Sequence, residues 1–346
     1  MCGIIATHLL VQGGLLNNAK VGTTQYWIIW LMQILVYCSV DVFAMLSGYL
    51  AYGKKQLNSF RAFELVAVVA FYCISITTLL AMFRPDIITG IKDVLVGFFP
   101  LIKGRYWYIT CYFPILLLSP YYTVLLEGIT VRQHRNLLII CLFFFSFVNS
   151  FISFFGPDLF AENQGYSFMW LSVCYVLGAY LKRADTFQIR RFKCFLGYFL
   201  CAAIVLLGNM LGYKILGYNV QYMASYISPF VVVMAVCTFC YFKDIKLGAS
   251  SQKIKSIVKR ISDTAFDVYI IHSHIFIFDY FLKDSLVVLL NQNLLMIPVI
   301  FLLLIVVLYF SLSLIGIIRI KLFEILGVQQ KFIKITRGKF SYTVGK

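Results

Sequence analysis

The 346-residue chain is 61% hydrophobic and only 13% charged, with a mean hydropathy of +0.87. A water-soluble domain of this length cannot bury so much apolar surface, so the composition excludes a soluble globular protein and requires lipid as part of its solvent. The formal net charge of +16 does not indicate nucleic-acid binding, because the Lys and Arg residues lie in the gaps between apolar runs, as membrane topology requires.

Apolar runs long enough to cross a hydrocarbon layer of about 30 Å predict about ten transmembrane helices. The runs lie near residues 3–16, 26–52, 62–83, 106–126, 136–155, 166–181, 194–213, 225–242, 264–282 and 291–318. Within each run the apolar residues are continuous and do not alternate with polar ones, which favours helices over the strands of a barrel. We therefore predict an all-α, polytopic integral membrane helical bundle, with a transmembrane domain at 1–320 and a basic cytoplasmic tail at 321–346.

The first run, residues 3–16, is short for a full crossing and has no basic residue before it. We expect this helix to be truncated at its N-terminus. His8 is the one ionisable side chain in the run. A neutral imidazole at membrane depth could take a proton from an acceptor hydroxyl, but a hydrogen bond to a neighbouring helix explains the same residue equally well.

The second run carries Asp41 and, further on, Ser47, Gly48 and Tyr49. A carboxyl group at membrane depth is a candidate functional group. The glycine permits close approach of another helix, and Ser47 and Tyr49 add hydroxyl groups. Helix packing alone also explains the Ser-Gly pair.

The connection at residues 84–105 is long and contains its own apolar stretch from Val94 to Ile102. We interpret it as a re-entrant or interfacial helix that lines a cavity; the alternative is an eleventh crossing, which would invert every later loop. At its end, Arg105 precedes Tyr106, Trp107 and Tyr108. These residues fit either an aromatic belt or a platform for sugar stacking or anion binding.

The ninth run contains His272 and His274. Residues two apart on a helix point in different directions, so they cannot bind one metal ion as an i, i+4 pair does, and no metal site is predicted. We expect one of these histidines to face the bundle and the other to be structural.

The distribution of cations predicts the orientation. With the N-terminus inside and every run crossing, 23 Lys and Arg lie on the cytoplasmic side, including all those from Arg319 onward, and seven lie outside. This asymmetry favours both termini in the cytoplasm.

Several segments together resemble the acyltransferase-3 family of membrane O-acyltransferases, in its bacterial polysaccharide O-acetyltransferase branch. The stretch 40–50, VDVFAMLSGYL, is similar to the family's second-helix signature. The stretch 105–110, RYWYIT, followed by Tyr112 and by Leu118-Ser119-Pro120, resembles its aromatic motif, and 268–272, VYIIH, resembles its late segment of tyrosine, two aliphatics and histidine. Residues 165–168 and 177–180 fit the polysaccharide branch.

The resemblance implies transfer of an acyl group, most often acetyl from acetyl-CoA, to a hydroxyl of a cell-surface or exported polysaccharide. It makes His8 the family's essential first-helix histidine, with Asp41 as its orienting partner. The residues expected to contact substrate are Ser47, Tyr49, Arg61, Arg105, Trp107, Tyr108, Tyr112 and His272. The implied partners are the lipid bilayer of a bacterial inner membrane, an acyl-CoA donor and a glycan acceptor.

One departure from the family pattern keeps other functions open. The family usually has an arginine about three helical turns before the histidine, and this chain has no residues there. A catalytically inactive relative or membrane sensor is therefore one alternative. A transporter or flippase for a lipid-linked glycan is another, although the inverted repeats and broken helices expected of it are not visible in the sequence.

Overall fold

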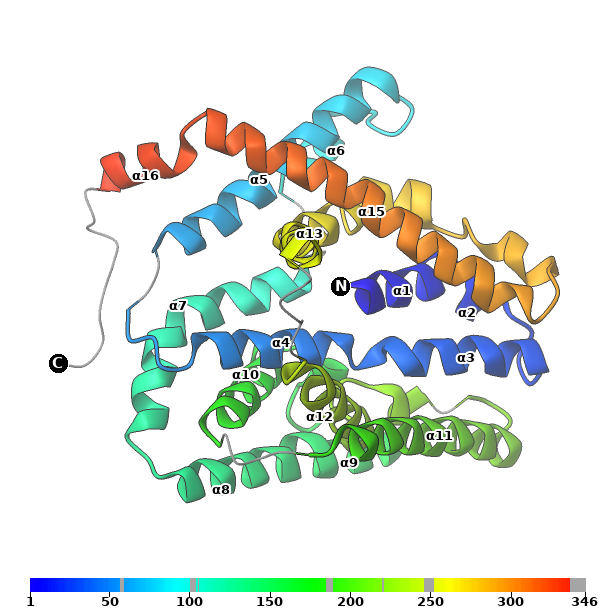
Figure 1. Cartoon of the computed structure of the whole chain (residues 1–346). Helices are drawn as coiled ribbons and strands as arrows, with labels where there is room; N and C mark the ends of the chain where they lie inside the picture. The colour runs from blue at the N-terminus through cyan, green and yellow to red at the C-terminus, as the bar shows by residue number, and fades with distance from the viewer. Residues whose placement is uncertain are drawn as a thin grey trace. The chain divides into compact units, whose positions relative to one another are not determined.

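The computed structural model describes residues 1–56, 59–99, 104, 106–184, 189–219, 221–245 and 252–336. These residues form helices of several lengths joined by short connections, and none of them lies in a strand. The chain divides into two compact units, and Figure 1 labels the helices that belong to them. The first comprises Met1–Ala19, Asn58–Thr110 and Leu247–Tyr342, and the second comprises Lys20–Leu57, Cys111–Lys246 and Thr343–Lys346.

The first unit brings together helices from both ends of the sequence. They are α1 (Cys2–Val11), α2 (Leu15–Asn18), α5 (Ser59–Phe83), α6 (Ile91–Phe98), α13 (Gln252–Asp263), α14 (Ala265–His272), the π-helix η6 (Ile277–Leu282), the 3₁₀-helix η7 (Val287–Asn291), α15 (Met296–Ile325) and α16 (Val328–Thr336). Helix α14 contacts α1, α5 and α15.

The second unit is built from the middle of the chain. Its elements are α3 (Thr24–Tyr37), α4 (Ser39–Ala51), most of α7 (Trp107–Glu127), α8 (Val131–Cys141), the π-helix η2 (Leu142–Val148), α9 (Asn149–Phe155), the 3₁₀-helices η3 (Asn163–Gly165) and η4 (Gln221–Ala224), α10 (Phe168–Arg183), α11 (Arg191–Leu216) and α12 (Pro229–Lys243). Helix α4 packs on α10 and α12, and α11 packs on α12 and α3.

Six helices of the described chain are long and apolar enough to cross a membrane. They are Thr24–Ala51, Phe60–Phe83, Trp107–Glu127, Val131–Ile152, Arg191–Leu216 and Met296–Ile325, with Pro229–Lys243 as a shorter apolar helix. The all-helical, multi-pass character predicted from sequence is therefore present. The count of about ten spans, the cytoplasmic placement of both termini and the domain boundary at residue 320 stay predictions.

Some of the predicted spans are interrupted. The run 3–16 is divided into α1 and α2, with a turn at residues 12–14 between them. The run 26–52 lies in the candidate span Thr24–Ala51, which has a one-residue turn at Cys38 between α3 and α4. The run 264–282 consists of α14 and η6, separated by a tight turn in which the His274 amide donates to the Ile271 carbonyl at 3.2 Å. Apolar periodicity does not detect such a break, because the hydrophobic run continues through it. The predicted helix in the connection 84–105 is present as α6, whereas residues 100–103 and 105 lie outside the described chain.

Hydroxyl side chains fix where several of these helices begin. The Thr23 side chain accepts from the Tyr26 amide, and the Ser167 side chain accepts from the Trp170 amide. Thr130 forms a capping box with Gln133 at the start of α8. Each cap satisfies backbone donors that the first turn of a helix leaves without intrahelical partners.

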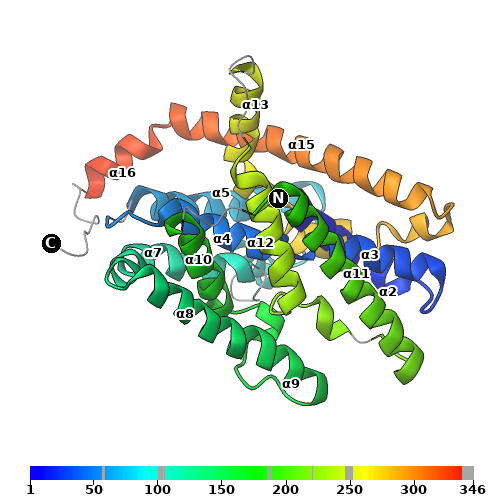
Figure 2. The same ribbon diagram turned by 60° about the horizontal axis from the view of Figure 1, so that its bottom comes forward.

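Helix α13 differs from its neighbours, because it is polar and basic on one face and apolar on the other. Ile254, Ile257 and Val258 on its apolar face are all more than half exposed. Figure 2 shows α13 standing out from the other helices of the first unit. An exposed amphipathic basic helix in a membrane protein is typical of the interface between headgroups and acyl chains.

Candidate active site

Two histidines from distant parts of the sequence meet in the first unit. Nδ1 of His8 in α1 lies 2.9 Å from Nε2 of His272 in α14, although the two residues are 264 positions apart. The hydroxyl oxygen of Ser273 lies 3.4 Å from the same His8 nitrogen. His272 is buried, whereas His8 is only partly buried. The pair therefore joins a buried imidazole to one that is partly accessible.

The position of His272 is set by the backbone of α14. Its Nδ1 lies 2.5 Å from the Val268 carbonyl oxygen, one turn earlier in the same helix. The fully buried Tyr106 donates its hydroxyl to the Ile270 carbonyl at 2.9 Å. Both contacts fix the turn of α14 from which the His272 ring projects.

The C-terminal end of α1 is fastened to the segment that follows α14. The Gln12 side-chain amide donates to the Phe278 carbonyl at 3.2 Å, and the Gln12 carbonyl accepts from the Asp284 amide at 2.8 Å. The Gly13 carbonyl accepts from the Leu286 amide at 3.0 Å. These bonds hold α1, and with it His8, in register with α14.

Aromatic rings surround the two imidazoles. Phe278 meets the His8 ring edge-on, with a centroid distance of 5.4 Å. The Tyr269 ring lies 6.4 Å from His8 and 6.0 Å from His272. Tyr108, predicted to bind substrate, lies 6.2 Å from Tyr269. The structure thus brings three of the predicted residues, His8, His272 and Tyr108, to one place.

A buried ion pair lies at the start of α14. Arg319 of α15 makes a bidentate contact with Asp267, at 2.7 Å to each carboxylate oxygen, and Tyr72 of α5 donates its hydroxyl to Asp267 at 2.8 Å. Asp267 is fully buried and Arg319 is 6% exposed. The sequence placed Arg319 among the cytoplasmic cations, so its structural role in binding α14 to α5 and α15 was missed.

Asp41 occupies a separate buried position in the second unit. Its Oδ1 accepts a hydrogen bond from the Trp170 indole at 3.0 Å and lies 3.7 Å from the Cys174 sulfur. It is 1% exposed. The predicted pairing of Asp41 with His8 stays a prediction, and the described partner of His8 in its own unit is His272.

The other predicted substrate residues are spread over both units. The Ser47 hydroxyl donates to the Phe43 carbonyl within α4, and the Lys182 ammonium lies 5.9 Å from the centre of the Tyr49 ring. Arg61 is exposed near the start of α5. Trp107 packs edge-on against Tyr108 in the first unit, and Tyr112 lies in the second. Arg105 lies outside the described residues.

His274 and the cysteines are the remaining side chains of a type that binds metals. No cluster of three or more His, Cys, Asp or Glu side chains with metal-binding geometry occurs in the described ranges. His274 is fully buried, and its ring centroid lies 5.7 Å from that of Phe276.

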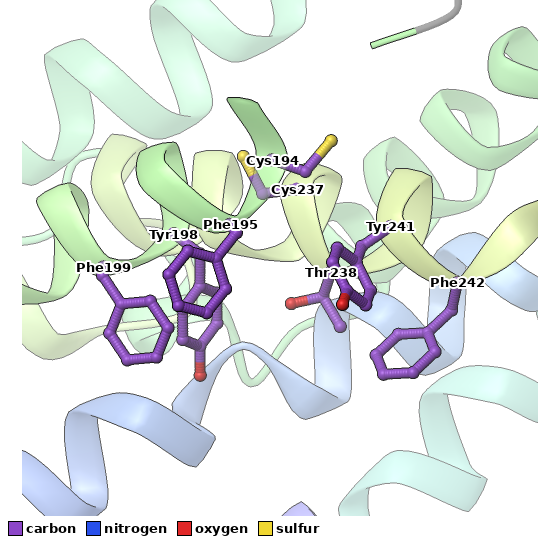
Figure 3. Close-up of a pocket in the computed structure, with 8 residues that line it drawn as sticks. All are labelled: Cys194, Phe195, Tyr198, Phe199, Cys237, Thr238, Tyr241 and Phe242. Carbon is purple, nitrogen blue, oxygen red and sulfur yellow. The ribbon is translucent and has the colours of Figure 1, made fainter. Parts of the chain in front are cut away.

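A groove of about 310 Å³ lies between α11 and α12 in the second unit (Figure 3). It is lined by Cys194, Phe195, Tyr198, Phe199, Cys237, Thr238, Tyr241 and Phe242. The Tyr198 and Thr238 hydroxyls already donate to backbone carbonyls of Leu35 and Met234. The groove thus presents apolar surface, as expected where a helix bundle meets lipid, and no histidine or carboxylate lines it.

Comparison with known proteins gives the family. The acyltransferase-3 family model, described as an acyltransferase domain, matches residues 1–316. The chain belongs to the acyltransferase-3 family. The match includes α1 and α14, so both histidines of the pair lie within the acyltransferase domain. No curated protein and no solved structure matches this acyltransferase.

Proposed function

We propose that this acyltransferase transfers an acetyl group from acetyl-CoA to a hydroxyl of a cell-surface or exported polysaccharide. Its setting is the inner membrane of a bacterium, with both termini in the cytoplasm. Family membership supports membrane acyl transfer in general. The choice of acetyl donor and glycan acceptor rests on the similarity of the motifs at 40–50, 105–110 and 268–272 to the polysaccharide O-acetyltransferase branch.

The observation that carries the proposal is the hydrogen bond between His8 and His272. The His8 ring takes the proton of the acceptor hydroxyl, whose oxygen then bonds to the thioester carbonyl carbon. The carbon–sulfur bond breaks and CoA leaves as a thiolate, which recovers a proton from the imidazolium. His8 is partly accessible, so a hydroxyl can reach it, and its partner His272 is buried and fixed.

The charge distribution suits an anionic donor. The cations assigned to the cytoplasmic side attract the phosphates of CoA, although topology alone already accounts for them. Aromatic side chains such as Trp107 and Tyr108 suit a sugar ring, because aromatic faces stack on apolar sugar surfaces. We assign Ser47, Tyr49, Arg61, Arg105 and Tyr112 to the same donor and acceptor contacts as a proposal.

Labelled acetyl-CoA tests the reaction. Membranes with the protein should transfer labelled acetate to cell-surface glycan, and membranes from cells lacking the gene should not. Equal labelling of the two membrane samples, with lipid-linked glycan accumulating in the cells that lack the gene, would contradict the enzyme and indicate a transporter.

Substitution of the histidine tests the site. His8→Ala should abolish labelling at an unchanged protein level. The matched control is Thr7→Val, because the Thr7 hydroxyl donates only within α1, to the Gly3 carbonyl at 3.1 Å. Thr7→Val should keep the activity, and activity retained by His8→Ala would remove His8 from the mechanism.

A further inference from the structure

The two histidines and a carbonyl form a chain of hydrogen bonds with one direction. The order is the Val268 carbonyl, Nδ1 and Nε2 of His272, and Nδ1 of His8, with separations of 2.5 Å and 2.9 Å at the two junctions. A carbonyl oxygen only accepts hydrogen bonds, so Nδ1 of His272 must carry the proton at that junction.

The first junction determines the second. A neutral His272 that is protonated at Nδ1 has a bare Nε2, which can only accept. Nδ1 of His8 lies 2.9 Å from this nitrogen and must therefore be the donor, and the more distant Ser273 hydroxyl, 3.4 Å from the same Nδ1, is then a second acceptor. A neutral His8 with its proton on Nδ1 has its lone pair on Nε2, and no described residue hydrogen-bonds that atom.

The reverse arrangement requires a charged His272. A ring protonated on both nitrogens could donate to His8, but the His272 side chain is only 2% exposed, and a buried charge is costly unless it is paired. The nearest carboxylate on α14, Asp267, is already held by Arg319 and Tyr72. In the described structure no carboxylate contacts either ring, so the neutral arrangement is favoured.

We propose that His272 is a positioning residue that holds His8 as the Nδ1–H tautomer and so makes Nε2 of His8 the atom that takes the hydroxyl proton. The inference rests on the proposed function for its catalytic meaning, whereas the tautomer itself is a property of the resting protein. When Nε2 gains the proton, Nδ1–H keeps its acceptor on His272, and the Val268 carbonyl keeps His272 in the accepting form. The proton then passes from Nε2 to the departing thiolate.

Nitrogen NMR of the full chain in micelles, labelled with [¹⁵N]histidine, tests the tautomer without any substrate. Protonated and bare ring nitrogens differ widely in chemical shift, and the His8 signals are assigned by their loss in His8→Gln. We expect a protonated Nδ1 and a bare Nε2 for His8 in the wild-type protein. A proton on Nε2 of the neutral wild-type ring would overturn the proposal, whether or not any variant folds.

Two substitutions of His272 separate positioning from packing. His272→Leu removes the acceptor at similar size, and should lower kcat about 100-fold or more while KM changes little, because a wrong tautomer removes the base. His272→Gln returns an acceptor oxygen and should restore both the Nδ1–H signal and roughly a tenth or more of the lost rate. A His8 tautomer that is identical in the wild type and His272→Leu would refute the positioning role.

The two proposals fail in distinguishable ways. In one case, the His8 tautomer is Nδ1–H and depends on His272, but the His8→Ala variant still transfers acetate. This result overturns the proposed function and leaves the positioning of the His8 ring by His272 intact. In the other case, His8→Ala loses acetate transfer, but His8 of the wild-type protein carries its proton on Nε2. This result overturns the positioning role of His272 alone.

Discussion

Gly48 in α4 lies directly against the backbone carbonyl of Tyr175 in α10. A β-carbon added at residue 48 would lie 1.9 Å from that oxygen, and one added at Gly178 would lie 1.8 Å from the Met45 carbonyl oxygen. Each helix therefore presents a glycine to the backbone of the other. Such close approach is how small residues let helices associate where lipid gives no hydrophobic driving force.

Gly48→Ala should destabilise the second unit by about 3 kcal/mol, because the new methyl group meets rigid backbone and the helices must separate. The thermal unfolding midpoint in detergent measures the effect. Gly128→Ala is the control, since its β-carbon would meet the Val124 carbonyl at an ordinary 3.4 Å. Equal midpoints for the two variants would contradict the close packing of α4 on α10.

Arg319→Met should cost about 3–5 kcal/mol of stability, because it leaves the Asp267 carboxylate buried with the Tyr72 hydroxyl as its described partner. The combined change Arg319→Met with Asp267→Leu should recover most of this loss, since an apolar pair leaves no buried charge. Unfolding midpoints of the single and double variants measure both effects. Arg84→Met, which breaks the exposed pair of Arg84 with Asp86, should leave the midpoint unchanged.

Glu162 should make stability fall as pH rises. It lies in the connection between α9 and α10, is 1% exposed, and burial raises its pKa above the ordinary 4.5, against a smaller opposing effect of its hydrogen bond from Ser167. A folded-state pKa above the unfolded value means that the folded state binds the proton more tightly. The contribution to stability is then complete below pH 4.5 and is lost as pH rises through the raised value.

The pH prediction is checked by unfolding midpoints between about pH 4 and pH 8. Glu162→Gln cannot ionise, so its midpoint should depend less on pH than that of the wild type. Parallel profiles for the two proteins would show that Glu162 does not titrate in this range.

Helix α13 should lie in the headgroup region, with its apolar face toward the acyl chains. Ile257 is on that face, and Ser256 is on the opposite one. Lipids brominated on their acyl chains should quench the fluorescence of the added tryptophan more strongly in the Ile257→Trp variant than in the Ser256→Trp variant. The quenching of the added tryptophan is measured as the difference from the fluorescence of the wild-type protein in the same lipids. Equal quenching at the two positions would place α13 outside the interface.

The sequence predicts the helices and the candidate residues of this fold better than the tertiary contacts that those residues make. The sequence indicates both His8 and His272 as candidates, because ionisable side chains at membrane depth stand out in apolar runs. Their hydrogen bond was not predicted, because no local pattern relates residues 264 positions apart. The proposed pairing of Asp41 with His8 stays a prediction, and the described hydrogen bond of Asp41 is with Trp170. Arg319 follows a long apolar run and so resembled a boundary cation, although it is buried on Asp267.

The fastening of α1 to α14 and to residues 278–286 imposes an order on biosynthesis. A ribosome completes α1 long before it reaches α14, so the His8 imidazole and the Gln12 amide leave the ribosome without the partners that they hold in the finished protein. Polar groups left in hydrocarbon are costly. Both side chains therefore stay with water or other polar partners at first, and α1 reaches its final place only when the last third of the chain has been translated.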